Sequence, residues 1–250
     1  MNYFQDRMRY IPFTVATIIF LFTSACATIP VYTDTPFRAN KEELHTKIKT
    51  IALKPLDIPD GLGNPGKINA IFEPLIMLKL HKAGFSIVES INYTEIWKRS
   101  CEQVGGVVDP VTGKSVDSRI QAAQLLCLEI LKTVFHADAL LTPKIEIVPA
   151  KFSDCKARWH GTSEQIDVVA LGIFCASGNM FGTVSALSLV VKVEDTQKNL
   201  LYVNSGGIQV LQRLEGFLVK DIVAVNEANL FTNNERNTAA VSIALGPLVQ

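Results

Sequence analysis

The residues with the greatest chemical potential in this 250-residue chain are its five cysteines and four histidines. One of them, Cys26, directly follows three small residues, Thr23, Ser24 and Ala25, and an apolar stretch lies before those. Small side chains at this position fit the narrow cleft of a signal peptidase. Cleavage there would make Cys26 the first mature residue, where its thiol can accept a diacylglyceryl group. The sequence therefore predicts lipidation of Cys26.

The first 25 residues have the parts of a signal peptide. Arg7 and Arg9 outnumber Asp6 in a weakly positive beginning, and residues 10–22 (YIPFTVATIIFLF) form an apolar core of the expected length. The segment FTSAC resembles the bacterial lipobox, although Thr23 stands where Leu is usual.

Two other interpretations of this segment stay open. No charge occurs between Arg9 and Asp34, so the stretch could remain uncleaved as an anchor helix. A membrane span needs about 20 mainly apolar residues, whereas the hydrophobicity falls at Thr23 and Pro30 follows soon after. Ordinary secretory cleavage without a lipid is the other alternative. All three interpretations take the chain out of the cytoplasm.

The second mature residue, Ala27, bears on the destination. In bacterial lipoproteins an Asp at this position favours retention in the inner membrane, so the lipobox resemblance implies sorting to the outer membrane, on its periplasmic side. Several acyl chains of the palmitate type anchor a protein stably, at about 0.8 kcal/mol per buried CH₂. We expect this covalent lipid on Cys26 to be the only cofactor, and the membrane to be the first partner.

The other four cysteines are candidates for disulfides, because an even number in an oxidising compartment favours bridges. They are Cys101, Cys127, Cys155 and Cys175, and they allow three pairings. Pairing by proximity in the sequence joins Cys155 to Cys175 and Cys101 to Cys127. For the second pair a buried free thiol is the open alternative, because Cys127 lies on the apolar face of an expected helix.

The sequence contains no pattern typical of a metal site or of a catalytic site. The four histidines, which do not pair at ligand spacing, are His45, His81, His136 and His160. Asp154, Cys155 and His160 could form a soft metal site with Cys175, but cysteines outside the cytoplasm more often form a disulfide. No serine or cysteine stands in a local signature with a base and an orienting group, as nucleophilic catalysis requires. We therefore expect no metal site and no catalytic residue.

Neither phosphate nor nucleic acid is an expected ligand. Gly113-Lys114-Ser115 ends like a phosphate-binding loop, but the motif needs Gly where Val108 stands. Asp109-Pro110 would also place a carboxylate and a missing N–H in the cradle, so the loop is interpreted as an exposed turn. Charges balance at 24 of each sign, which gives no electrostatic reason to expect nucleic acid.

The two tryptophans are candidate contacts for a partner protein. Trp97 lies on an expected amphipathic helix, which favours burial in the core. Trp159 lies in the polar segment 154–162 (DCKARWHGT), which is expected to be a loop. We therefore predict Trp159 as the exposed partner contact.

Hydrophobic periodicity predicts the elements that position these residues. The first expected helix ends at Ala83 and is followed by Gly84 as its cap; Pro74 either marks its start, near Glu73, or kinks it. Two more helices are expected over 93–101, capped by Asn92, and over 117–134, capped by Asp117. The last begins at Thr232, with a Thr232–Glu235 capping box, and ends at about Gly246. The expected strands are 48–56, 85–89, 137–152, 166–174, 182–196 and 199–212, with a bulge at Gly206–Gly207.

This order of elements predicts an α+β fold, in which helices pack on a mixed, largely antiparallel sheet as an α/β sandwich. Residues 1–25 are expected to be the signal peptide and 26–47 an irregular tether. Residues 48–250 are expected to form a single periplasmic domain.

Four segments carry a family resemblance: IKTIALKPLD, KLHKAGFSIVES, INYTEIWK and VFHADALLTPKIEIV. In this order they resemble a group of periplasmic lipoproteins that includes the curli-secretion lipoprotein, the outer-membrane activator of penicillin-binding proteins and the amino-terminal domain of TolB. The shared features are the first strand and the two junctions at GFSIVE and ADALL. The resemblance implies a scaffold or binding partner in envelope assembly rather than an enzyme.

The expected function is thus that of a non-enzymatic component that binds another envelope protein. One alternative is an envelope hydrolase, which a deep pocket gathering Asp154, His160 or Glu164 would favour. Another is a subunit of an oligomeric secretion or motility complex. An exposed apolar strip or sheet edge would favour the binding role.

Overall fold

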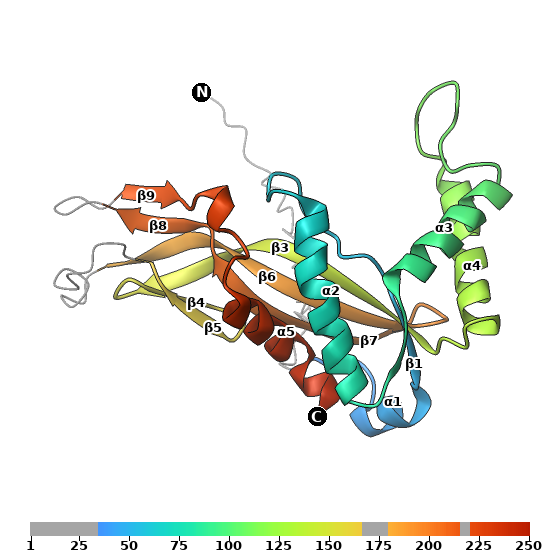
Figure 1. The fold of residues 1–250 in the computed structure, drawn as a ribbon, viewed down its shortest axis with the longest axis horizontal. Coiled ribbons are helices and arrows are strands. Elements are labelled where there is room, and N and C mark those ends of the chain that lie inside the picture. Colours follow the sequence, from blue (N-terminus) through green and yellow to red (C-terminus); the bar gives the residue numbers. More distant parts are fainter. Residues whose placement is uncertain (1–34, 167–179, 216–220) are drawn as a thin grey trace, which may run out of the picture. The chain divides into compact units, whose positions relative to one another are not determined.

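The computed structural model describes residues 35–166, 180–215 and 221–250. Within them helices pack on a mixed, largely antiparallel sheet, which confirms the predicted α+β class (Figure 1). The helices are α1 (Lys41–Lys47), α2 (Pro65–Lys82), α3 (Ser90–Gln103), α4 (Asp117–Thr133), the 3-10 helix η2 (Glu227–Asn229) and α5 (Asn234–Val249). The strands are β1 (Thr50–Leu53), β2 (Ser86–Val88), β3 (Ala139–Ser153), β4 (Lys156–Trp159), β5 (Thr162–Gln165), β6 (Phe181–Asp195), β7 (Leu200–Val210), β8 (Gln212–Glu215) and β9 (Asp221–Ala224).

The main sheet runs in the order β2-β1-β3-β6-β7. Strand β1 is parallel to both β2 and β3, and the helices α2, α3 and α4 supply the crossovers that parallel pairing requires. Strands β3 and β6 pair antiparallel along their full length, from Ala139 opposite Asp195 to Ser153 opposite Phe181. The long β3–β6 pair therefore forms the centre of the sheet.

One face of the sheet is buried by α2 and α5. Alternate residues of the long strands, such as Ile145 and Leu189, point to this face because side chains alternate along a strand. Helix α2 meets them with a stripe of fully buried side chains spaced four residues apart, namely Ile68, Phe72, Ile76 and Leu80. Burial of each such side chain stabilises the fold by about 1.5–3 kcal/mol.

The opposite face is covered at its two ends by different elements. Near β1, helices α3 and α4 bury a cluster that includes Ala52, Ile96 and Leu131. At the far ends of β3 and β6, the β4–β5 hairpin buries a second cluster that includes Phe152 and Trp159. Figure 1 shows the α3–α4 pair and the β4–β5 hairpin at opposite ends of the sheet.

The predicted bulge at Gly206–Gly207 is confirmed. Leu187 lies opposite Gln209 but Ser188 lies opposite Gly207, so β7 carries one extra residue there. A Cβ atom on Gly206 would lie 2.0 Å from the carbonyl oxygen of Ala240 on α5. A Cβ atom on Gly207 would lie 2.7 Å from Nε1 of Trp159. The two glycines thus let α5 and the β4–β5 hairpin approach β7 closely.

Helix α2 is longer than the sequence indicated. It begins at Pro65, where Oδ1 of Asn64 accepts hydrogen bonds from the backbone N–H groups of Gly66 and Lys67, and it continues through Pro74. The predicted end is confirmed, because Gly84 follows the helix with a φ of +88°.

The predicted caps of three helices are wrong. Helix α3 begins at Ser90, so Asn92 lies inside it, and α4 is preceded by Val116, which places Asp117 at its first residue. Helix α5 is capped by Asn233, whose Oδ1 accepts from Arg236 N at 3.0 Å. It runs to Val249 rather than ending at Gly246. Glu89 and Val116, which precede α3 and α4, make no side-chain cap hydrogen bond, so these two helices begin without the cap that the sequence pattern suggested.

The predicted boundary between tether and domain is also wrong. Residues from Thr35 onward belong to the folded unit. Phe37 bridges Tyr202 at the edge of β7, with Arg38 N donating to Leu201 O and Val203 N donating to Pro36 O, each at 2.9 Å. Leu44 of α1 is buried in the main core. Seven residues of helix with one buried leucine give too weak a periodic signal to be recognised in the sequence.

The segment 154–162 is a hairpin rather than a loop. Asp154 and Cys155 turn β3 into β4, and His160 and Gly161 turn β4 into β5. All four residues have positive φ angles, as the two-residue turns favoured in hairpins require. The strand predicted at 166–174 lies outside the described residues beyond Ile166. The β8–β9 hairpin was not predicted.

In the described part of the chain, no helix is both long and apolar enough to cross a bilayer.

Candidate functional site

Two of the predicted site residues, Cys26 and Cys175, lie outside the described residues. Lipidation of Cys26 and the bridge from Cys155 to Cys175 therefore stay predictions. Cys155 itself is fully buried and is a disulfide-bonded cysteine.

The other two cysteines are free thiols, so of the two alternatives left open for this pair the structure has the buried free thiol at Cys127. Cys127 is buried on α4 and hydrogen-bonds the hydroxyl of Tyr93 on α3. Burial raises the pKa of the Cys127 thiol to about 11. Cys127 contacts Tyr93 on α3. Cys101 lies two helical turns beyond Tyr93 on the same helix, so it is displaced along the helix axis from the residue that Cys127 contacts.

Trp159 is not an exposed partner contact. It is 7% exposed and lies in the cluster beneath the β4–β5 hairpin. Its indole Nε1 donates to Leu187 O at 3.0 Å. The prediction failed because four-residue strands flanked by polar turn residues do not show a clear apolar alternation, and Trp159 was therefore assigned to a loop.

His160 and Asp154 lie at two different turns. Nδ1 of His160 lies 2.8 Å from Oγ of Ser188, which is fully buried. Partial burial of the ring lowers the pKa of His160, against a smaller opposing effect of Glu146. Asp154 is exposed in the β3–β4 turn. The His160 contact joins the β4–β5 turn to the buried Ser188 of β6.

Glu164 is a buried carboxylate with structural partners. Its side chain is 3% exposed. Oε2 accepts from Val210 N at 2.9 Å, and Oε1 accepts from Arg213 at 3.2 Å and forms an ion pair with Arg236. Asp154, His160 and Glu164 therefore lie in three different environments rather than around one pocket.

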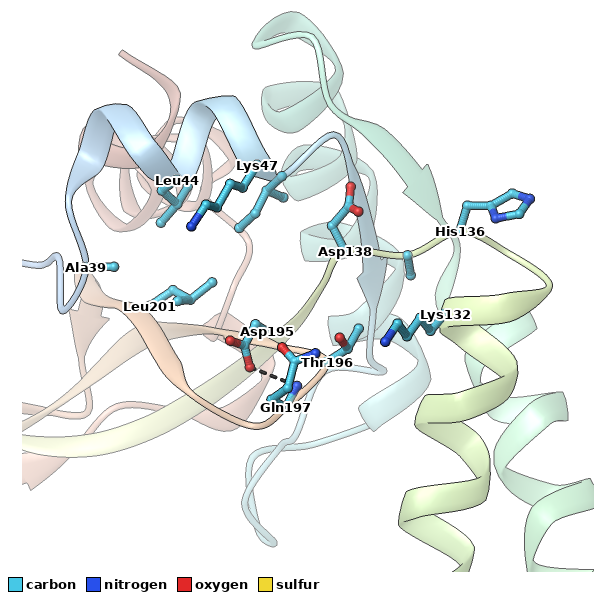
Figure 2. A pocket seen from close by; sticks show the side chains of 12 residues that line it. Ala39, Leu44, Lys47, Lys132, His136, Asp138, Asp195, Thr196, Gln197 and Leu201 are labelled. Atoms are coloured by element: carbon cyan, nitrogen blue, oxygen red, sulfur yellow. Dashed lines mark hydrogen bonds between the residues drawn. The ribbon is translucent and has the colours of Figure 1, made fainter.

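Two cavities flank the turn between β6 and β7, and Asp195 lines both. The first has a volume of about 560 Å³ and lies between α1, the end of α4 and this turn. Figure 2 shows Leu44 and Leu201 on its apolar side and Lys132 reaching toward Thr196. The ring of His136, although part of the lining, points away from the interior (Figure 2).

The second cavity, about 420 Å³, lies between the α3–α4 pair and the sheet. We call it the Tyr93–Trp97 cavity. Its lining consists of Lys54, Tyr93, Trp97, Gln124, Cys127, Leu128, Leu140, Glu194, Asp195 and Lys198. Trp97, predicted as a core residue, packs against the α3–α4 cluster and also lines this cavity. Both volumes lie in the range typical of sites for small ligands.

The carboxylates near these cavities have local partners. Asp138 Oδ2 accepts from the backbone N–H groups of Lys49 and Thr50 at 2.8 and 2.9 Å, which fixes the start of β1. Asp195 Oδ1 accepts from Gln197 N and Asn199 N in the turn, and the first of these bonds is drawn in Figure 2. These two acids therefore fix the backbone at the start of β1 and in the β6–β7 turn.

The lining of the Tyr93–Trp97 cavity favours binding over catalysis. Burial raises the pKa of the Tyr93 hydroxyl and that of the Cys127 thiol, so both groups stay protonated at neutral pH. Sequence reasoning missed Lys54, Tyr93 and Lys198 as lining residues, because β1, α3 and the β6–β7 turn contribute them from distant parts of the chain. A pattern along the sequence carries no signal for such a convergence.

Within the described residues, no three His, Cys, Asp or Glu side chains are grouped in a way that could hold a metal ion. No protein-family model matches the chain, and no curated protein matches its sequence.

Proposed function

We propose that the protein is an outer-membrane lipoprotein, anchored through Cys26 on the periplasmic side, that binds another envelope protein and catalyses no reaction itself. The signal sequence ending in FTSAC supports the anchor. The observation that carries the binding role is the exposed apolar tip of the loop between α3 and α4.

This loop, residues 104–116, projects beyond the two helices (Figure 1). Val111 at its tip is 91% exposed, and Val108 is 52% exposed. Asp109 fixes the tip, because its Oδ1 accepts from the backbone N–H groups of Val111 and Thr112 at 2.9 and 2.8 Å. An apolar side chain held outward in one conformation loses little entropy when a partner covers it.

The helices that carry the loop also expose apolar side chains, namely Ile91, Leu125 and Val134. Ile91 and Val134 lie at the ends of the two helices that are farther from the loop, so they add exposed apolar side chains along the α3–α4 pair rather than at its tip. The titratable groups considered for catalysis are engaged elsewhere, since Glu164 pairs with two arginines and His160 contacts a buried serine. Both facts support a binding role.

The anchor is tested by replacing Cys26 with Ala and by treating cells with globomycin. Cys26→Ala removes the acceptor thiol, so the precursor should stay uncleaved and unlabelled by radioactive palmitate. Globomycin blocks only the peptidase, so it should leave an uncleaved precursor that still carries the label. A Cys101→Ala control should be processed and labelled normally. Normal processing and membrane attachment of the Cys26→Ala protein would exclude lipidation at this residue.

The binding role is tested with a photo-crosslinking amino acid at position 111 in intact cells. Leu78 on α2 is a matched control site, because it is also apolar and is 52% exposed. We expect a discrete adduct from position 111 and none from position 78. An adduct of twice the monomer mass would indicate a self-associating subunit, and equal adducts from both positions would contradict a specific surface.

A further inference from the structure

The Tyr93–Trp97 cavity has an apolar body with two lysines at its margin. Leu128 of α4 and Leu140 of β3 line it together with the two aromatic rings of α3. Lys54 and Lys198 enter from the end of β1 and from the β6–β7 turn. Ligand sites commonly combine apolar walls with a few polar groups that fix the orientation of the ligand.

Lys54 and Lys198 are the cationic side chains that line this cavity. Among the described residues neither Lys54 nor Lys198 has a carboxylate within salt-bridge distance. The Nζ of Lys54 lies 5.5 Å from the centroid of the Tyr93 ring, which places its ammonium group at the aromatic wall. The Nζ of Lys198 donates to the neutral Oε1 of Gln124 at 3.1 Å.

The two acids in the lining are held by other groups. Glu194 pairs with Lys192, with 2.8 Å between Oε1 and Nζ. Both carboxylate oxygens of Asp195 accept hydrogen bonds from Gln197 or Asn199 within the turn. The ammonium groups of Lys54 and Lys198 thus keep N–H donors available for a ligand.

Lys198 also holds an unfavourable backbone conformation. Its φ is +67° at the turn position where hairpins of this kind usually have Gly or Asn. A non-glycine residue in this region is disfavoured by roughly 1 kcal/mol or more. Its side chain nonetheless extends to α4 at the margin of the cavity. A strained residue at the edge of a cavity is a reason to look for a role of its side chain.

We propose that the Tyr93–Trp97 cavity binds a small carboxylic acid with an aromatic or short aliphatic body. The body lies against Tyr93, Trp97 and Leu140, and the carboxylate accepts hydrogen bonds from Lys54 and Lys198. This site lies on the side of the α3–α4 pair that faces the sheet and requires neither the lipid nor the partner protein, so it goes beyond the function proposed above.

The proposal is tested with three probes that share one apolar body: 3-phenylpropionate, 3-phenylpropan-1-ol and 3-phenylpropylamine. Binding to the full mature protein is followed by tryptophan fluorescence. The chain has two tryptophans, and Trp159 is buried in a different cluster, so a change on titration reports Trp97. We expect the acid to bind about 10-fold more tightly than the alcohol or the amine.

Two variants examine the lysines separately. Lys54→Met keeps the aliphatic part of the side chain, and Lys198→Gly suits the positive φ of the turn, so both should fold. Each should weaken binding of the acid about 5- to 10-fold, as loss of one charged hydrogen bond does, and leave binding of the alcohol unchanged. Lys151→Met is the matched control, because Lys151 is exposed on β3 at the far end of the sheet.

Three results would overturn the proposal: binding of the amine as tightly as the acid, equal loss for the Lys151→Met control, or no binding of any probe at millimolar concentration. A Trp97→Phe protein that still shows the full fluorescence change would overturn it as well, because the signal would then come from Trp159.

Discussion

Glu164 joins three separate elements through one buried carboxylate. It lies on β5, and its oxygens contact the backbone of β7, Arg213 on β8 and Arg236 on α5. Both arginines are about 40% exposed, so water screens their charges in part, whereas the carboxylate is 3% exposed. The cluster therefore fixes the position of α5 over the β4–β5 hairpin.

Replacing Glu164 with Gln should lower the free energy of unfolding by about 2–4 kcal/mol, because removing one partner leaves buried polar groups uncompensated. Urea-induced unfolding measures the change. Glu146→Gln is the control: its ion pair with Lys144 is exposed, so the loss should be below about 1 kcal/mol. Equal losses for the two variants would show that Glu164 has no special structural role.

His160 gives the stability a dependence on pH. Its pKa is lowered in the fold by partial burial, so the unfolded chain takes up a proton near pH 6.5 more readily than the folded one. The stabilisation is complete above about pH 6.5 and is lost as the pH falls toward the folded pKa.

His160→Asn should flatten the unfolding free energy between pH 5 and pH 7, since Asn does not titrate and suits the positive φ of this turn. A native pH profile in the His160→Asn protein would refute the assignment.

At the scale of elements, the contact of α5 with β7 depends on Gly206. Gly206→Ala places a methyl group 2.0 Å from a backbone oxygen of α5, and no rotation of a side chain can relieve this clash. The helix must move, at a cost of about 3 kcal/mol or more. Thermal unfolding checks the change. Gly246→Ala, within α5 itself, meets only Gln250 at 3.8 Å and should raise stability by up to about 1 kcal/mol.

The elements that could be predicted are those with a long periodic signal or an unambiguous glycine. Helix α4, the long strands β3 and β6, the Gly84 cap and the Gly206–Gly207 bulge are of this kind. The β4–β5 hairpin was missed because its strands are four residues long and its turns contain Cys155 and His160, which rarely mark a turn. Tertiary packing, which places Trp159 beneath Gly207, decides such a segment.

The candidate site was even less predictable than the fold. Trp97 was singled out, but as a core residue, and Lys54 and Lys198 carry no local pattern. Their convergence follows from the β1–β3–β6 order and from the packing of α3 and α4 on one end of the sheet. Only the three-dimensional arrangement brings together an apolar cavity and two lysines that have no ion-pair partner in the described part of the chain.

At the scale of the whole molecule, the position of the domain boundary can be measured. A chain that begins at Thr35 should have the full stability of the mature protein. A chain that begins at Ile48, the boundary suggested by the sequence, loses the buried Leu44 and the contact of Phe37 with Tyr202. We expect a loss of about 3 kcal/mol in the free energy of unfolding, because two large apolar side chains are removed. Equal stability of the two chains would show that residues 35–47 are dispensable.

The pairing of residues 36–38 with the edge of β7 also limits how far the domain can stand from a bilayer. If the lipid is on Cys26, nine peptide units connect it to Thr35. Even fully extended, such a length of chain covers only about 30 Å. A boundary at Ile48 would have allowed more than twice that distance. With the lipid on Cys26, the edge of β7 that pairs with residues 36–38 would lie within about 30 Å of the membrane surface.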